Sequence, residues 1–183
     1  MNIKVLLVDD HKIIRDGLSA ILKSEKDIQI IAEAGTGKEA LDKVHCLVPD
    51  VVIMDLTLPD MGGMQVTRRI LAEYPGVKVL ILTMFLDENC VFESLEAGAR
   101  GYLAKDCASE ELVVAIRSIH QGKPYFCAGC QEIMLKKCMA TSTSANPTQI
   151  LTKRETEVLK LTAQGLCTKE IALPFSSRTG LLT

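Results

Sequence analysis

Four short apolar runs divide the first part of the chain, and each run leads directly to a polar residue. In chain order, these residues are Asp9, Asp55, Thr83 and Lys105. Short, nearly continuous apolar runs that alternate with helical patterns are typical of parallel strands buried on both faces. Because open α/β sheets place their sites at the carboxyl ends of parallel strands, we expect these polar side chains to meet at one edge of a sheet.

Strand and helix patterns alternate as far as residue 121. Strands are predicted at about 4–8, 28–34, 51–54, 78–83 and 101–104. Helices are predicted, from apolar residues at helical spacing, at about 12–24, 37–46, 64–74, 87–97 and 109–121. Five strand–helix units imply a parallel α/β sheet with right-handed crossovers and helices on both faces.

The alternation of strand and helix patterns does not continue beyond residue 121. Residues 122–139 are ambiguous, with a short helix predicted at 131–139, and the polar run 141–147 has no apolar period and is typical of a linker. Beyond the linker, Thr152 caps one predicted helix, and a second predicted helix stops at Pro174. We therefore expect three parts, at 1–121, 122–147 and 148–183.

Composition and charge exclude several classes of protein. The formal net charge of −2 gives no bulk attraction to nucleic acid or to an anionic membrane, and no apolar stretch approaches the ~20 residues of a membrane span. The N-terminus enters a strand pattern directly, so a cytosolic protein without a membrane partner is expected. The seven scattered cysteines favour reduced thiols over a disulfide framework.

The predicted sheet edge carries the residues for phosphoryl chemistry. Asp9 and its neighbour Asp10, together with Asp55, suit a hard cation with oxygen ligands, most simply Mg²⁺. Asp55 can attack a phosphoryl group, and the cation and the Lys105 ammonium can offset the negative charge on the oxygens of that phosphoryl group. The Thr83 hydroxyl can donate to a phosphoryl oxygen. A single carboxylate at a strand end usually caps a helix or is solvated, but four strands that each deliver such a residue favour a site.

These residues stand in motifs that resemble a known family. Val-Asp-Asp-His at 8–11, the stretch at 54–63, Leu-Thr at 82–83 and Gly-Tyr-Leu-Ala-Lys at 101–105 look like the receiver domain of bacterial two-component response regulators. The resemblance covers about residues 1–121 in the family's order. It implies a flavodoxin-like, doubly wound five-stranded sheet with strand order 2-1-3-4-5.

The resemblance also implies a role for each polar residue. Asp55 would accept a phosphoryl group from a sensor histidine kinase, with Thr83 as the switch hydroxyl and Lys105 as the phosphate-binding lysine. The Mg²⁺ ligands would be Asp9, Asp10, Asp55 and the backbone carbonyl of Thr57.

A switch would follow from phosphorylation. Thr83 would move inward, and Tyr102 on the last strand would reorient, although a half-buried strand tyrosine is an equally good interpretation of that residue. Many receivers carry proline after the lysine that corresponds to Lys105, whereas this chain has Asp106. The geometry of that peptide bond is therefore left open.

The last part resembles a DNA-binding family. Residues 151–159 and 165–172 look like the opening half of a LuxR-type helix-turn-helix, which makes the chain similar to the NarL/FixJ class of transcription regulators. In that class two more helices follow, and the first of them reads the major groove. Because Pro174 interrupts the pattern and nothing follows Thr183, we expect an incomplete all-α segment, produced by truncation or a shifted frame.

The expected output depends on that segment. A phosphorylated response regulator of this class would form a homodimer and bind DNA, but the few basic residues of 148–183 are mixed with acids, so specific DNA binding is not expected here. The alternative is a receiver that acts through protein–protein contacts or phosphate competition. A phosphatase with an aspartyl nucleophile is a third class, which Thr57 disfavours because such enzymes commonly carry an acid there. We expect no enzyme activity beyond the chain's own phosphorylation and dephosphorylation.

One further motif has a minor alternative. Cys127 and Cys130 form a lone C-x-x-C, which lacks the second ligand pair of a closed zinc site. We expect it not to lie at a strand-to-helix turn of the thioredoxin type. Reduced thiols that pack against the first domain are therefore expected, with metal or redox chemistry as the minor alternative.

Overall fold

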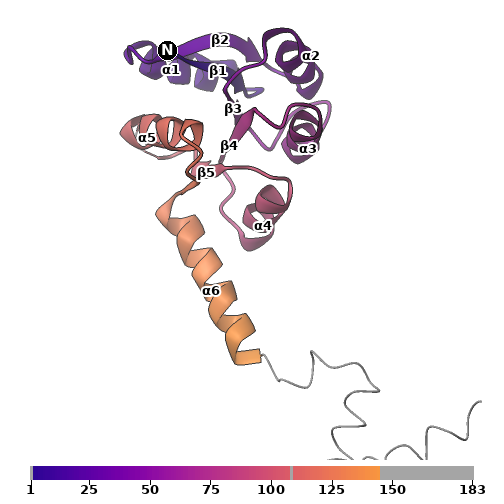
Figure 1. Ribbon diagram of the computed structural model, residues 1–183, viewed down its shortest axis with the longest axis vertical. Helices are drawn as coiled ribbons and strands as arrows, with labels where there is room; N and C mark the ends of the chain where they lie inside the picture. Colours follow the sequence, from indigo (N-terminus) through magenta and orange to yellow (C-terminus); the bar gives the residue numbers. More distant parts are fainter. Residues whose placement is uncertain (1, 108, 145–183) are drawn as a thin grey trace, which may run out of the picture. The chain divides into compact units, whose positions relative to one another are not determined.

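The fold is a parallel sheet with helices on both faces. The computed structural model describes residues 2–107 and 109–144, so the predicted linker end and the helices beyond it lie outside the described residues. The strands follow the order β2-β1-β3-β4-β5-β6, and every neighbouring pair is parallel. The labels of Figure 1 follow this order from β2 to β5. Their bounds are β1 Ile3–Val8, β2 Ile28–Ala34, β3 Val51–Met54, β4 Lys78–Thr83, β5 Gly101–Ala104 and β6 Tyr125–Phe126.

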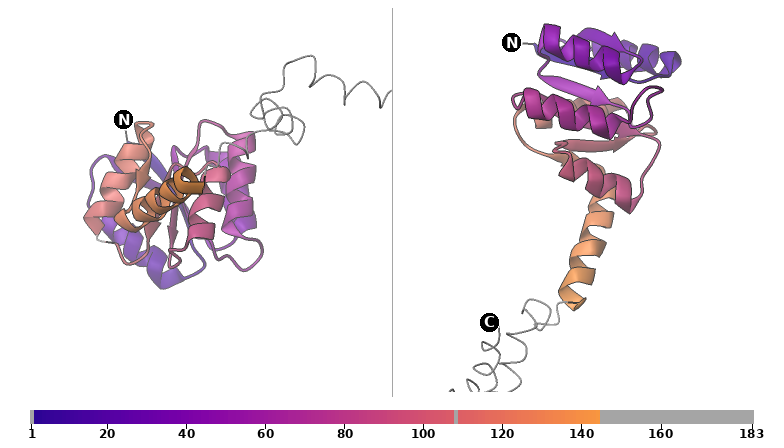
Figure 2. Two further views of the ribbon diagram at one scale, coloured as in Figure 1. Left: turned by 90° about the horizontal axis from the view of Figure 1, so that it is seen from below. Right: turned by 90° about the vertical axis from the view of Figure 1, so that its right-hand side faces the viewer.

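Helices connect the strands and cover the sheet from both sides. Their bounds are α1 Lys12–Lys23, α2 Gly37–Leu47, α3 Gly63–Glu73, α4 Glu88–Glu96, α5 Ser109–His120 and α6 Ala128–Ser144. In Figures 1 and 2, α1 and α5 lie on one face of the sheet, and α2, α3 and α4 lie on the other. In the part of the chain that the structure describes, no helix is long and apolar enough to cross a membrane.

Successive side chains of each strand point to opposite faces of the sheet, so the core has two layers, one on each face. One layer joins strand residues such as Leu6, Val52 and Ile81 to α2, α3 and α4, and the other joins residues such as Leu7, Ile53 and Leu80 to α1 and α5. Because both faces are covered, the central strands β1, β3 and β4 are almost wholly buried. The apolar runs of the sequence are the direct consequence of this burial.

The flavodoxin-like fold and the order 2-1-3-4-5 are confirmed, but the prediction of five strands is wrong by one. The extra strand, β6, pairs with the edge of β5, where the Tyr125 amide donates to the Arg100 carbonyl at 3.0 Å and the Cys127 amide donates to the Tyr102 carbonyl at 3.1 Å. Two residues are too few for an apolar period, so no pattern in the sequence announces this strand. Helix α6 is also longer than the predicted 131–139.

Candidate functional site

The site lies at the carboxyl ends of β1, β3, β4 and β5. Backbone hydrogen bonds join the ends of neighbouring strands. The Asp9 amide donates to the carbonyl of Ala34 in β2 at 3.1 Å, the Asp55 amide to the carbonyl of Val8 at 2.9 Å, and the Lys105 amide to the carbonyl of Thr83 at 2.8 Å. Because the strands are parallel, their last residues and the residues that directly follow them lie at the same edge, and Thr83 is the last residue of β4. The structure brings together three of the four predicted side chains, those of Asp9, Asp55 and Lys105, whereas Thr83 Oγ1 bonds the Phe85 amide.

The buried ammonium of Lys105 bridges the carboxylates of Asp9 and Asp55. Lys105 Nζ lies 2.6 Å from Asp9 Oδ2 and 2.8 Å from Asp55 Oδ2. The three side chains are only 6%, 4% and 4% exposed, in the order Lys105, Asp9, Asp55. Charges removed from water in this way require partners, and each of these groups has one.

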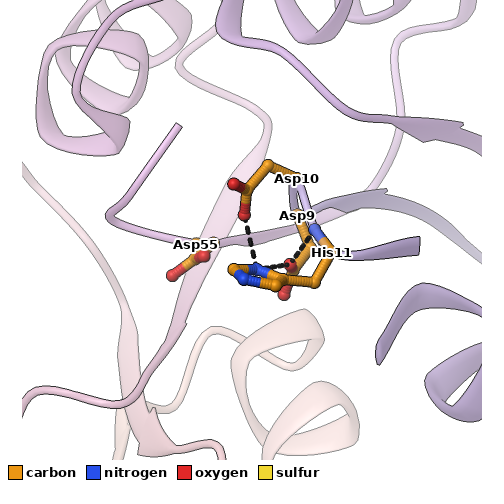
Figure 3. Close-up of side chains that lie close together, drawn as sticks. All are labelled: Asp9, Asp10, His11 and Asp55. Atoms are coloured by element: carbon orange, nitrogen blue, oxygen red, sulfur yellow. Dashed lines mark hydrogen bonds and ion pairs between the residues drawn. The ribbon is translucent and has the colours of Figure 1, made fainter. Parts of the chain in front are cut away.

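Asp10 and His11, which connect β1 to α1, lie beside these carboxylates. His11 Nδ1 lies 2.6 Å from Asp10 Oδ1 and 3.4 Å from Asp9 Oδ1, and the His11 amide donates to Asp9 Oδ1 at 2.9 Å (Figure 3). One ligand atom from each of Asp9, Asp10, His11 and Asp55 lies within 4.8 Å of the others. His11 follows the acidic pair directly in the sequence, and the structure shows that its ring contacts both carboxylates.

Burial and hydrogen bonds between charged groups have opposite effects on the pKa values of Asp55 and Lys105. Burial raises the pKa of Asp55 above its usual value, and the hydrogen bond from the Lys105 ammonium only partly offsets that effect. For Lys105, burial lowers the pKa, but hydrogen bonds to Asp55 and Asp9 outweigh burial, so the pKa lies above 10.5. The lysine therefore stays charged at neutral pH, and its hydrogen bond favours the ionised form of Asp55.

The donor set fits a hard divalent cation. Carboxylates of Asp9, Asp10 and Asp55 converge within reach of one ion, and oxygen is the ligand that Mg²⁺ and Ca²⁺ prefer. The cluster carries three carboxylates against one buried ammonium, so a cation there would improve the balance of charge. Thr57 is exposed two residues after Asp55, and its amide hydrogen bond lowers the pKa of that carboxyl.

Thr83 and Tyr102 meet at the backbone of Phe85. Thr83 is fully buried, and its Oγ1 accepts a hydrogen bond from the Phe85 amide at 3.3 Å. The Tyr102 hydroxyl donates to the Phe85 carbonyl at 2.6 Å, and its side chain is fully buried. Of the two interpretations of Tyr102, the half-buried strand tyrosine is wrong, because β6 pairs with β5 and Cys130 of α6 packs in the same core layer.

Two features of the site could not be predicted from the sequence: the close approach of Gly63 to Asp55, and the geometry of the Lys105–Asp106 peptide bond. A Cβ on Gly63 at the start of α3 would lie 2.0 Å from the Asp55 carbonyl oxygen, so only glycine allows this approach. The described peptide bonds are all trans, which settles the open geometry of Lys105–Asp106. Close backbone approach depends on how β3 and α3 pack, which residue patterns do not encode.

Comparisons with known proteins identify two families along the chain. Residues 5–117 match the model of the response regulator receiver domain, and residues 149–176 match that of bacterial regulatory proteins of the luxR family. The response regulator protein VraR of Staphylococcus aureus is 38% identical over 172 residues, which cover 94% of this chain and 81% of VraR.

Solved structures give the same result for the fold. A LuxR-family two-component response regulator from Aurantimonas superposes with a TM-score of 0.73 at 32% identity, over 76% of this chain and 99% of that one. The receiver domain of the response regulator NarL from Mycobacterium tuberculosis gives a TM-score of 0.65 at 29% identity, over 67% and 98%. The chain thus belongs to the two-component response regulators of the NarL/FixJ class, with a receiver domain followed by a LuxR-type segment.

Proposed function

We propose that Asp55 is the phosphoacceptor of this response regulator and that Mg²⁺ binds beside it. The observation that carries the proposal is the buried Asp9–Lys105–Asp55 bridge at the sheet edge, with Asp10 within reach of the same ion. The Lys105 ammonium bonds Asp55 directly and links it to Asp9, a second buried carboxylate. An ordinary solvated aspartate at a strand end has neither neighbour.

The residues divide the chemistry of transfer between them. An oxygen of Asp55 attacks the phosphorus of a phosphohistidine on a sensor kinase, the O–P bond forms, and the N–P bond to the histidine breaks. The Lys105 ammonium offsets negative charge on the transferred group. Mg²⁺, held by Asp9, Asp10, Asp55 and the Thr57 carbonyl, would supply further neutralisation of phosphoryl oxygens.

Thr83 and Tyr102 would report the phosphoryl group to the surface. A Thr83 hydroxyl that turns to a phosphoryl oxygen would give up the hydrogen bond from the Phe85 amide. Phe85 is also bound by Tyr102, so the loop between β4 and α4 would adjust with both residues. Met84, Phe85 and Leu86 in that loop are exposed, so the adjustment changes a surface that a partner can contact.

The output of the switch would be transcriptional control. The LuxR-type match at 149–176 supports DNA as a partner, and a homodimer on phosphorylation is part of the same proposal. The predicted absence of a groove-reading helix concerns residues outside those the structure describes and stays a prediction. A gel mobility shift with promoter DNA, with and without phosphorylation, tests it: selective binding would contradict the prediction, and no binding would favour an output through protein contacts.

Acetyl phosphate tests the phosphoacceptor directly. With Mg²⁺, intact mass spectrometry should show one added phosphoryl group on the wild-type chain and none on Asp55→Ala. Asp16→Ala is the matched control, because Asp16 is an exposed carboxylate on α1 that pairs only with Lys12 among the ion pairs of the described residues. Modification of Asp55→Ala at the wild-type level would refute the assignment.

Removal of the cation tests the metal part separately. A chelator should abolish modification, added Mg²⁺ should restore it, and Asp10→Asn should require a higher Mg²⁺ concentration for half-maximal modification. Phosphorylation that is insensitive to chelation would leave Asp55 as the acceptor but would contradict a metal-dependent site.

A further inference from the structure

A pair of thiols lies at the junction of β6 and α6, away from the acidic site. Cys127 Sγ and Cys130 Sγ are 3.4 Å apart, and both residues are free cysteines. Cys127 directly precedes α6, and its carbonyl accepts the hydrogen bond of the first helical turn from the Gln131 amide at 3.1 Å. The sequence predicted no strand-to-helix turn of the thioredoxin type here, but the motif does lie where a strand leads into a helix, because β6 ends at Phe126 and α6 begins at Ala128.

Helix geometry explains why these two sulfur atoms meet. The side chain of a residue at the cap position points to the third residue of the helix, as the side chains of capping serine and threonine do. Cys127 and Cys130 occupy these two positions. A disulfide needs a sulfur separation of about 2.05 Å, so the pair has to close by only about 1.3 Å.

The two thiols differ in their access to solvent. Cys130 is fully buried in the core layer that contains Tyr102, whereas Cys127 is only partly buried. Burial raises the pKa of the Cys130 thiol, and its contact with Cys127 raises it further. The partly exposed Cys127 thiol is the one that a small disulfide reaches first, and the Cys130 thiol lies close enough to attack the mixed disulfide that forms there.

We propose that Cys127 and Cys130 form a reversible dithiol–disulfide site that reacts with low-molecular-weight disulfides. Cys127 loses its proton and attacks one sulfur of the small disulfide, whose S–S bond breaks and releases one thiol. Cys130 then loses its proton and attacks the Cys127 sulfur, which releases the second thiol. Two electrons pass from the cysteines to the small disulfide, which becomes two thiols that take up the two protons.

The site adjoins a part of the receiver that carries the proposed switch. The Cys127 amide donates to the Tyr102 carbonyl at 3.1 Å, and Cys130 Sγ lies 4.0 Å from the same oxygen. Between the cysteines, a Cβ on Gly129 would lie 2.5 Å from Leu86 Cδ2, so the first turn of α6 packs directly on the loop after β4. A disulfide would therefore restrain the contact between α6, β5 and this loop.

Oxidised glutathione is the probe for the reaction. The full reduced chain is incubated with rising ratios of oxidised to reduced glutathione, and free thiols are then alkylated and mapped by peptide mass spectrometry. We expect Cys127 and Cys130 to lose alkylation together and their peptide to be lighter by two hydrogens. Continued alkylation of both residues, at a ratio that modifies the exposed Cys46, would overturn the proposal, and so would a disulfide between Cys127 and Cys107.

Single variants test the order of the two steps. Cys130→Ser should accumulate one glutathione on Cys127, whereas Cys127→Ser should leave the buried Cys130 unmodified. Cys46→Ser is the matched control and should leave the disulfide intact. If Cys130→Ser does not fold, as judged by circular dichroism, Cys130→Ala serves as the second trap. Glutathione on Cys130 rather than on Cys127 in folded variants would contradict the assigned order.

Hydrogen exchange tests the restraint. We expect amides at 84–87 and 127–131 to exchange more slowly in the oxidised chain than in the reduced chain, while amides of α1 remain unchanged. Equal exchange in both states would overturn the claim that the disulfide restrains this contact.

Discussion

At the scale of single residues, Lys105 is the centre of the site because it neutralises two buried carboxylates at once. Removing the ammonium would leave Asp9 and Asp55 facing each other without a cation, and like charges in a buried site are costly. The pKa of Lys105 lies above 10.5 because hydrogen bonds to both carboxylates outweigh burial. The lysine therefore contributes stability only while it holds its proton.

The first prediction concerns the pH dependence of that contribution. The difference in free energy of unfolding between wild type and Lys105→Met should be fully present below pH 10.5 and should shrink as the pH rises through the higher pKa of the folded state. Urea unfolding on both sides of pH 10.5 measures this difference. Lys12→Met, which removes an exposed lysine paired with Asp16, should change stability little, and a constant difference for Lys105→Met would contradict the assignment.

The hydroxyl of Tyr102 supports the second prediction. Tyr102→Phe keeps the buried ring but removes the donor to the Phe85 carbonyl, so the free energy of unfolding should fall by about 1 kcal/mol. Tyr74→Phe is the control, because its hydroxyl bonds His45 Nδ1 in an exposed setting and should matter less. Denaturant unfolding of both variants gives the comparison, and an equal loss would show that burial adds nothing to the Tyr102 bond.

Residue patterns predicted the polar residues at the strand ends but not the partners of those residues. The proximity of Asp9, Asp55 and Lys105 follows from parallel strands that end at one edge. The bond from Tyr102 to Phe85 and the sulfur contact at Cys127 depend on how a loop and a helix pack against β5. Such contacts leave no period in the sequence, which is why they were missed.

At the scale of elements, the five predicted strands and the five helices of the receiver start and end within one residue of the structure. The periods are strong because each strand is covered on both faces and each helix has one buried face. The prediction missed β6 and made α6 too short, since the helix predicted at 131–139 lies inside Ala128–Ser144. A two-residue strand has neither the length nor the alternation from which a strand can be inferred.

The third prediction tests the close packing of α3 on the site. Gly63→Ala would place a Cβ 2.0 Å from the Asp55 carbonyl oxygen and 2.9 Å from Leu56 Cα, both in backbone that cannot rotate away. We expect a loss of about 1–3 kcal/mol in the free energy of unfolding and slower phosphorylation by acetyl phosphate, because the start of α3 must move away from β3.

The neighbouring glycine provides the control for this prediction. A Cβ on Gly62 meets nothing within 4 Å, and the residue has an ordinary negative φ of −62°. Gly62→Ala should therefore keep most of the stability and the phosphorylation rate. Equal effects at both positions would show that loop conformation, rather than the approach to Asp55, determines the loss.

At the scale of the whole molecule, Arg117 ties a late helix of the receiver to an early loop. From α5, its guanidinium contacts Asp27 at 2.6 Å and Glu25 at 2.7 Å, in the connection between α1 and β2. Both helices pack on the same core layer of the sheet. The ion pairs thus join segments that are 90 and 92 residues apart in sequence.

The fourth prediction follows from this link. The hydrogen bond from Arg117 lowers the pKa of Asp27 below 3.8, so the ionised carboxylate contributes stability above pH 3.8 and loses that contribution as the pH falls through the lower folded-state value. The stability advantage of wild type over Arg117→Gln should therefore be full at neutral pH and should vanish in acid. Because the pair is exposed, raising the salt concentration should reduce the same advantage. Urea unfolding over pH and salt measures both effects, with Arg68→Gln on the exposed side of α3 as the control. An advantage that persists in acid would mean that packing of the arginine stem, rather than its charge, joins α5 to the start of β2.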